Sequence, residues 1–161
     1  MTSVVVLSDT HSHRLPDIIS ARIDACDIVI HAGDFSSLDY YDYLLSFGKD
    51  VIGVAGNMDS YALSEKLPMS RIITVESLRI AVMHGWGAPA CVEQSVRTSF
   101  NEDEWDVLIY GHTHFPIVHH DGHKVILNPG STSDKRFAPY KSYAELKING
   151  AFCTECSIIP L

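Results

Sequence analysis

The sequence has little positive charge. Its 161 residues contain 12 Lys and Arg against 20 Asp and Glu, which gives a net charge of −8 with histidine neutral. Proteins that bind nucleic acid along an extended surface usually present a basic field, because contacts with the phosphate backbone dominate their affinity. The composition therefore argues against nucleic acid as the main partner, although it does not exclude the active site of a nuclease.

Long hydrophobic runs and a basic leader are also missing. No stretch approaches the roughly 20 apolar residues that span a bilayer, and Met1–Leu7 has neither a positive region nor a small-residue cleavage site. We therefore expect a cytoplasmic protein with no membrane partner. The chain also lacks internal repeats, low-complexity tracts and linkers, so we expect a single domain over residues 1–161.

The four cysteines do not form a metal-binding pattern. Only Cys153 and Cys156 are closely spaced, and no second pair completes a zinc site. This pair lies in an alternating strand pattern, whereas a redox motif is expected where a strand meets a helix. We predict ordinary buried or edge-strand thiols.

The first half of the sequence shows a repeated pattern of strands and helices. Apolar strand patterns at Val4–Leu7, Ile28–Ile30 and Val51–Ala55 alternate with helical spacings over Leu15–Ala25 and Tyr40–Phe47. This β-α-β-α-β order predicts parallel strands with right-handed crossovers, whose carboxyl ends meet at one edge of a sheet.

The second half of the chain is richer in hairpins. A strand pair is expected at Arg71–Glu76 and Leu78–Met83, followed by a weak helix over Cys91–Phe100. Further strands flank the turn signals Asp121-Gly122 and Asn149-Gly150, which predict two hairpins.

Nearly every predicted strand that reaches this edge ends in a side chain able to bind a metal. The mixture of imidazole, carboxylate and amide suits Mn, Fe, Ni, Co or Zn, and the absence of thiolate argues against a structural zinc site. Seven ligands exceed the needs of one tetrahedral ion, so two ions bridged by one carboxylate are predicted. The candidate ligands are Asp9, His11, Asp34, Asn57, His84, His112 and His114.

The order of these motifs resembles that of the calcineurin-like metallophosphoesterases. Asp-x-His, Gly-Asp, Gly-Asn, His-Gly and Gly-His-Thr-His follow one another here, and the chain looks most like the small, single-domain phosphodiesterase branch. The resemblance implies an α/β (α+β) fold with two packed mixed β-sheets and helices on both outer faces. It also implies two ions: Asp9, His11, Asp34 and His114 would hold the first, and Asp34 would bridge to the second, which Asn57, His84 and His112 would complete.

The activity implied is hydrolysis of a small phosphorylated substrate, with phosphodiesters favoured over monoesters. A hydroxide bridging two divalent ions would attack phosphorus in line, with Mn favoured as the metal and Ni, Fe, Co or Zn open. Asn57 and His84 would then hold phosphate oxygens or the ions that bind them. Asp59 is a further catalytic candidate, either as a proton relay or by fixing Asn57.

One position departs from the family pattern. Many members carry a histidine after Gly-Asn, and this histidine is thought to protonate the leaving group or to hold the phosphate. Here the position is Met58, and methionine cannot transfer a proton. The change favours substrates with a good leaving group, and it leaves the source of any general acid open.

Two other functions are compatible with the sequence. A non-catalytic protein-binding scaffold like the retromer small subunit belongs to the same branch, and a nuclease is the third alternative. The complete set of ligand types favours an enzyme over a scaffold. Exposed hairpin edges would allow a homodimer.

Several residues near these motifs have two interpretations. His31 is either a partner of a ligating carboxylate or a hydrogen-bonded strand histidine, and His13 either reaches substrate or is simply exposed. Asn128 and Ser131 belong to a good turn sequence, but they could also orient ligands. Lys135 and Arg136 are expected to be surface charges.

Overall fold

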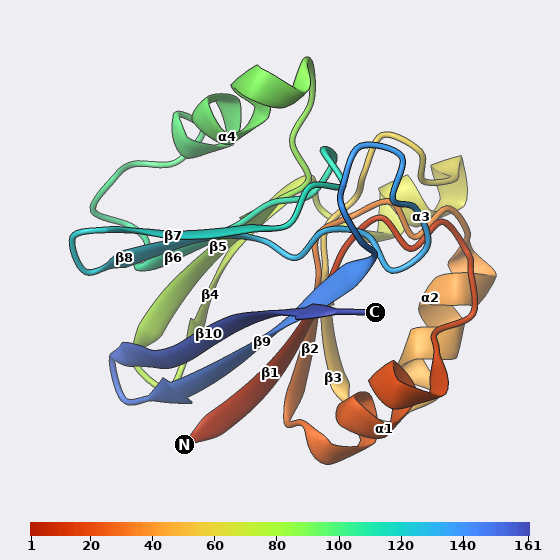
Figure 1. The fold of residues 1–161 in the computed structure, drawn as a ribbon, viewed down its shortest axis with the longest axis horizontal. Helices are drawn as coiled ribbons and strands as arrows, with labels where there is room; N and C mark the ends of the chain where they lie inside the picture. The colour runs from red at the N-terminus through yellow and green to blue at the C-terminus, as the bar shows by residue number, and fades with distance from the viewer.

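The computed structural model describes residues 1–161 as two five-stranded sheets with four helices (Figure 1). The first sheet contains β1 (Thr2–Leu7), β2 (Ile28–His31), β3 (Asp50–Gly53), β9 (Ser142–Asn149) and β10 (Phe152–Pro160). The second contains β4 (Ser70–Val75), β5 (Leu78–Met83), β6 (Val107–Ile109), β7 (Ile117–Asp121) and β8 (Lys124–Asn128). The helices are α1 (Asp17–Ala25), α2 (Leu38–Leu45), α3 (Tyr61–Lys66) and α4 (Pro89–Arg97).

The first sheet is parallel on one side and antiparallel on the other. Its order is β10-β9-β1-β2-β3, and β1 pairs with β2, and β2 with β3, in parallel. Along β1, Val4 and Val6 pack into the core that contains residues of both sheets, while Val5 and Leu7 pack into the cluster that contains α1 and α2. A strand buried on both faces needs a continuous apolar run, which explains the β-branched sequence of β1.

The second sheet repeats this arrangement. Its order is β4-β5-β6-β8-β7, with β5, β6 and β8 parallel and with β4 and β7 antiparallel at the two edges. Each sheet thus contains three neighbouring parallel strands. The loops after their carboxyl ends meet at one end of the molecule, and this places the predicted ligands together.

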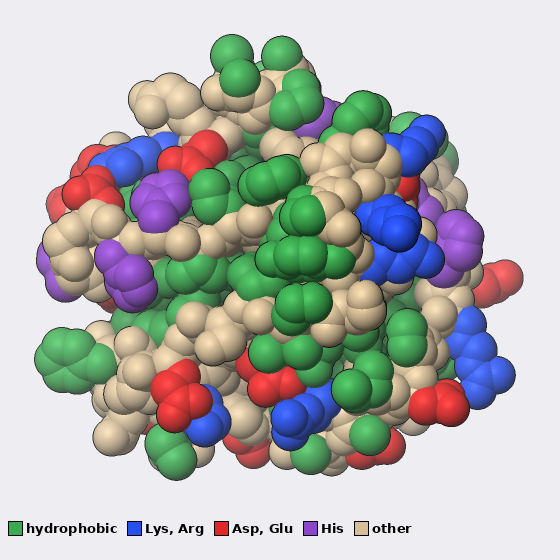
Figure 2. Space-filling model, in the orientation of Figure 1, with side chains coloured by type: hydrophobic (Ala, Val, Ile, Leu, Met, Phe, Trp, Pro, Cys, Tyr) green, Lys and Arg blue, Asp and Glu red, His purple; other side chains and the backbone are tan.

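Helices cover the outer faces of both sheets. Ile19 and Ile23 of α1 and Leu44 of α2 are buried against the first sheet, while α4 buries Val92 and Val96 over the second. In Figure 1, α4 lies beyond the second sheet and α1 and α2 lie beside the first. The predicted sandwich of two mixed sheets with helices on both outer faces is confirmed. The face shown in Figure 2 carries interspersed acidic and basic side chains, with hydrophobic side chains along its middle.

The structure differs from the sequence predictions mainly at element ends. Helix α3 was not predicted, because it has six residues and buries only Leu63, too little for a periodic signal. Helix α1 begins at Asp17 rather than at Leu15, because Pro16 precedes it in an extended conformation (ψ 147°). Cys153 and Cys156 are free thiols on the edge strand β10. None of the four helices has the length and hydrophobicity needed to cross a membrane.

Packing between the sheets should dominate the free energy of unfolding. Ile80 of β5 is fully buried in the core that both sheets share, whereas Ile72 of β4 remains 43% exposed. We expect Ile80→Ala to lower the free energy of unfolding by about 2–5 kcal/mol, because a buried cavity remains, and Ile72→Ala to lower it by less than about 1 kcal/mol. Urea unfolding followed by circular dichroism measures both, and equal losses would contradict this account of the core.

Candidate metal centre

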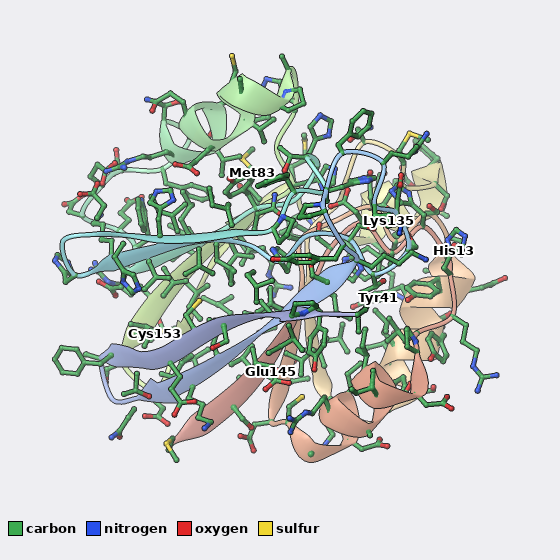
Figure 3. The ribbon with its side chains drawn as sticks, in the orientation of Figure 1. His13, Tyr41, Met83, Lys135, Glu145 and Cys153 are labelled. Atoms are coloured by element: carbon green, nitrogen blue, oxygen red, sulfur yellow. The ribbon has the colours of Figure 1, made fainter.

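The seven predicted ligands come together at the end of the sandwich where the parallel strands finish. Five of the strands contribute: β1 is followed by Asp9 and His11, β2 by Asp34, β3 by Asn57, β5 by His84, and β6 by His112 and His114. In Figure 3, His13 and Lys135 mark the loops at this end of the molecule.

Sharp backbone turns direct these side chains inward. Five of the predicted ligands have positive φ angles of 47–66°, a conformation that costs a residue other than glycine about 1–3 kcal/mol. This conformation lets the chain turn sharply within one or two residues of a strand end. Ligands two residues apart, such as His112 and His114, can then point in different directions. The five residues are Asp9, His11, Asp34, His112 and His114.

One group of ligands forms around Asp9 and His114. Oδ1 of Asp9 lies 3.2 Å from Nε2 of His114, and Nε2 of His11 lies 3.4 Å from the same nitrogen. Oδ2 of Asp34 lies 4.0 Å from Nε2 of His11. Ligand atoms of Asp9, His11 and His114 are therefore close enough to hold one ion.

A second group forms around His84 and Asn57. Nε2 of His84 lies 3.3 Å from Oδ2 of Asp34 and 3.1 Å from Oδ1 of Asn57. Nδ1 of His112 lies 3.0 Å from the same amide oxygen of Asn57. His112 and His114 thus point into different groups, as the assignment to two ions requires, and Asp34 faces both.

Asp9 also approaches the second group, since its Oδ1 lies 3.8 Å from Nε2 of His84. This oxygen is buried and accepts no hydrogen bond of good geometry. A buried carboxylate oxygen without a hydrogen bond carries a large desolvation cost. A cation held between Asp9 and the surrounding imidazoles would remove that cost, so the donor set fits a divalent metal ion.

The buried carboxylates and imidazoles of the site shift one another's pKa values. Burial opposes ionisation of Asp9, but contact with His114 and the charge of His84 keep the pKa of its carboxyl below the ordinary value. Burial likewise opposes a charge on His84, yet Asp34 and Asp9 raise the pKa of its imidazole to about 9. The two carboxylates therefore favour the protonated form of His84, and a bound metal would displace that proton.

Three of the four imidazoles also contact an oxygen through their other ring nitrogen. Nδ1 of His84 lies 2.7 Å from the carbonyl oxygen of Ala32, and Nε2 of His112 lies 3.1 Å from that of Gly87. Nδ1 of His114 lies 3.3 Å from a carboxylate oxygen of Asp134. Such contacts fix the ring orientation and tautomer of a metal-binding histidine.

Sequence reasoning did not find Asp134, because no spacing relates it to His114. Its carboxylate also contacts the guanidinium group of Arg136, which holds the pKa of Asp134 near 2. Asp134 is therefore ionised at neutral pH, and it links Arg136 to the imidazole of His114.

Two glycines allow the loops to approach this closely. A Cβ atom on Gly111 would lie 2.0 Å from Oγ of Ser8, and one on Gly56 would lie 2.2 Å from Oδ1 of Asp34. Because Gly111 is so close, the backbone N–H of His112 can donate to Oδ2 of Asp9 at 3.0 Å, and Ser8 donates to the same oxygen at 2.6 Å.

Asp59 binds backbone rather than facing the cleft. Its carboxylate accepts from the N–H groups of Gly56 and Ser36, both at 2.7 Å, and of Asp34 at 3.2 Å. Burial raises the pKa of this carboxyl. These contacts tie the loop that carries Asn57 to the loop that carries Asp34, so the structure gives Asp59 a positioning role. Its predicted catalytic role stays a prediction.

The turn that contains Asn128 and Ser131 supports the ligand loops. Nδ2 of Asn128 donates to the carbonyl of Gly111 at 2.9 Å, and Oγ of Ser131 donates to the carbonyl of Asp9 at 2.7 Å. Of the two interpretations of this turn, orientation of the ligands agrees with these contacts.

His31 is a hydrogen-bonded strand histidine that lies between ligand loops. Its ring stacks on Phe35 with 3.6 Å between ring centroids and contacts Oγ1 of Thr10 at 2.9 Å. Burial lowers the pKa of His31 to about 3, so the ring is neutral. Its other ring nitrogen accepts from the backbone N–H of Gly33. His31 therefore connects Thr10, which follows Asp9, with Gly33, which precedes Asp34.

A cleft of about 460 Å³ opens above these residues. Asp9 and His84 are absent from its wall because both are buried beneath it. His13, Met58 and Arg136 line it, so His13 is placed to reach a ligand, and Arg136 is a surface charge, as predicted, that lies at the rim of the cleft. Lys135 does not line it. The cleft is lined by His11, His13, Asp34, Asn57, Met58, His112, His114, Ser133, Asp134 and Arg136.

Solved structures with this fold include a Thermotoga maritima protein determined by NMR, which is 34% identical, with a TM-score of 0.75 and full coverage of both chains. Vps29 from Entamoeba histolytica in complex with Zn²⁺ is 23% identical, with a TM-score of 0.74 and 98% of each chain covered. The second likeness concerns the fold alone.

Curated relatives include two proteins of Methanocaldococcus jannaschii. A probable metallophosphoesterase is 33% identical over 161 aligned positions, covering 97% of this chain and 80% of the relative. A phosphodiesterase is 29% identical over 140 positions, covering 78% and 81%. The model of the calcineurin-like phosphoesterase superfamily domain matches residues 2–151. The chain therefore belongs to the calcineurin-like phosphoesterase superfamily.

Proposed function

We propose that the protein is a phosphodiesterase that works with two divalent metal ions, Mn by preference. The observation that carries this proposal is the buried Oδ1 of Asp9, which has no well-oriented hydrogen bond and lies 3.2 Å and 3.8 Å from imidazole nitrogens of two other loops. A purely structural cluster would be expected to satisfy this oxygen with a hydrogen bond. The family, and its phosphodiesterase member from M. jannaschii, support the choice of reaction.

The contacts support a division of the ligands between two positions. Asp9, His11 and His114 surround the first position. His84 marks the second, where its ligand atom lies close to those of Asp9 and Asp34 and where Asn57 contacts both His84 and His112. Asp34 is the proposed bridge, because its Oδ2 faces Nε2 atoms of both His11 and His84. Asp9 lies between the same two groups, and it is the alternative bridge.

When bound, two such ions polarise a phosphoryl group and lower the pKa of a water molecule that can attack phosphorus. The protein's own contribution is to hold the ligands rigidly before substrate arrives. Backbone carbonyls fix His84 and His112, and Asp59 fixes the loop of Asn57. Preorganisation of this kind lowers the cost of reaching the transition state.

The cleft itself orients the substrate. Arg136 is the one Lys or Arg side chain among its lining residues, and it is placed to pair with a phosphate oxygen that faces solvent. Met58 lies at the position where many family members carry the histidine thought to protonate the leaving group, and it offers no proton. The proposed substrates are accordingly diesters whose leaving group departs without protonation by residue 58.

A second function deserves testing because Vps29 structures share this fold. The alternative is a protein-binding scaffold without turnover. The presence of all seven ligand types and of the cleft above them favours the enzyme. Hydrolysis of a bis-aryl phosphate, an aryl monoester and single-stranded DNA, assayed side by side with Mn, separates phosphodiesterase, monoesterase, nuclease and scaffold.

Loss of the proposed bridge should abolish turnover. We expect Asp34→Asn to lower kcat/KM for a bis-aryl phosphate by more than about 100-fold, because changes even to groups behind metal ligands cost 10- to 100-fold. Elemental analysis should show fewer ions per chain than in the unaltered protein. Asp24→Asn, at an exposed aspartate of α1, is the matched control and should change neither value. Full turnover by protein stripped of metal would contradict the proposal.

Restoring a proton donor should change the dependence on the leaving group. Met58 is 61% exposed in the cleft, so a histidine can be accommodated there. We expect Met58→His to raise kcat about tenfold or more for a phenyl leaving group and far less for a 4-nitrophenyl group, since general-acid catalysis helps poor leaving groups most. Met58→Leu is the control of similar volume. An equal gain on both substrates would show that position 58 does not act on the leaving group.

A further inference from the structure

A second cavity adjoins the metal centre, and Met58 is not among the residues that line it. Its volume is about 300 Å³, at the lower end for small-molecule sites. Candidate ligands Asn57 and His84 form part of its wall, and Met69, Met83 and Trp86 contribute apolar surface. No Asp, Glu, Lys or Arg lines it. In Figure 3, Met83 marks the end of β5 from which this wall continues.

Trp86 is held beside the metal centre in an exposed position. Its side chain is 50% exposed, whereas Trp105, the other tryptophan, is fully buried. It lies between Gly85 and Gly87, whose φ angles of 92° and 91° favour glycine over other residues. A Cβ atom on Gly85 would lie 2.6 Å from Val92 of α4, so the loop passes too close to that helix for another residue.

The loop that carries Trp86 is fixed at both ends. His84 contacts the carbonyl oxygen of Ala32 before it, and the carbonyl oxygen of Gly87 contacts His112 after it. The indole is thus attached to the same frame as two candidate metal ligands. An exposed large apolar side chain in a fixed loop at the edge of a reactive site indicates a binding surface rather than part of the core.

We propose that this cavity binds a planar aromatic ring on the ester group that phosphorus retains, stacked on Trp86. This inference rests on the proposed phosphodiesterase function and names its substrate class. Apart from His84, which belongs to the metal centre, the side chains that line the cavity are uncharged, so it suits a neutral ring and not a second phosphate or a carboxylate. Its thioether groups add polarisable surface that packs well against aromatic rings.

The position of Asn57 decides which ester group enters the cavity. Asn57 lines both spaces, while Met58 lines only the metal cleft and Trp86 only the second cavity. A leaving group on the side of residue 58 therefore lies across Asn57 from Trp86. The ring bound by Trp86 then belongs to the ester that remains on phosphorus. Aryl groups and nucleobases both offer such a ring, and the substrates below distinguish them.

The test holds the leaving group constant and varies the retained ester. Mn-loaded protein is assayed with three 4-nitrophenyl phosphodiesters, in which the second ester is methyl, phenyl or 5′-thymidyl. We expect the ring-bearing diesters to have the higher kcat/KM. Trp86→Ala should raise KM for them about tenfold or more, the effect of losing one stacked ring, and should leave kcat and the methyl diester nearly unchanged.

Two variants serve as controls. Trp86→Phe keeps a flat ring and should retain most of the preference. Phe152→Ala removes an exposed aromatic side chain from the distant β9–β10 hairpin and should have no effect. A greater loss for phenyl than for thymidyl identifies an aryl site, and the reverse identifies a nucleobase site. An equal loss on all three diesters, or no loss on any, overturns the proposal.

Binding can be followed without turnover. Because Trp105 is fully buried and Trp86 is half exposed, a ring that stacks in the cavity should quench the fluorescence of Trp86. We expect quenching by phenyl phosphate or thymidine 5′-phosphate, not by methyl phosphate, and none in Trp86→Ala. If no diester is hydrolysed, the proposed function fails while this titration still decides the cavity. Equal responses to ring-bearing and methyl phosphates would overturn the ring site.

Discussion

The buried carboxylate of Asp9 is the group on which the rest of the centre depends. Its backbone N–H donates to the carbonyl of Gly33, and its own carbonyl accepts from Ser131, so it joins the loops after β1, β2 and β8. Its Oδ2 accepts from the backbone of His112 and thereby holds the loop after β6. Oδ1 has no well-oriented hydrogen bond and instead faces the imidazoles, 3.2 Å from Nε2 of His114. The contacts that assemble the loops leave one acceptor for a cation.

The backbone strain and the buried carboxylates of this arrangement raise the free energy of the folded protein, and a bound cation would offset part of that cost. Five predicted ligands adopt positive φ angles, and the carboxylates of Asp9 and Asp34 are both buried. Strained backbone and desolvated charge persist only where the surrounding structure enforces them. Here the two packed sheets enforce them, because each parallel strand ends in a short loop anchored on its neighbours. The packed core therefore stabilises the fold enough to maintain the strained backbone and buried charges of the preorganised site.

Sequence reasoning predicted that the seven candidate ligands lie together because the ends of parallel strands can be recognised in a sequence. An apolar run followed by Asp, Asn or His marks a parallel strand that delivers a polar group to the sheet edge, and the sandwich followed from the resemblance. Contacts between loops that are distant in the sequence could not be predicted from the sequence alone. Asp134 meets His114, and Asp59 binds three N–H groups, only because the tertiary fold brings them there. Helix α3 was missed because six residues with one buried side chain leave no period. The separation of His112 from His114 needed the turn geometry after Gly111.

The shared fold of enzymes and Vps29 proteins raises the question of what a metal centre beside apolar surface is for. A scaffold needs a complementary surface, and it gains nothing from an unpaired buried acceptor or from a charged cleft. Here the apolar surface at Trp86 is connected to the cleft through Asn57 and His84, which line the second cavity as well as taking part in the ligand groups. In the proposed function, such continuity would link recognition of a substituent to the position of the phosphorus atom. A small molecule that occupies both spaces uses this link, whereas a protein partner would need only the outer surface.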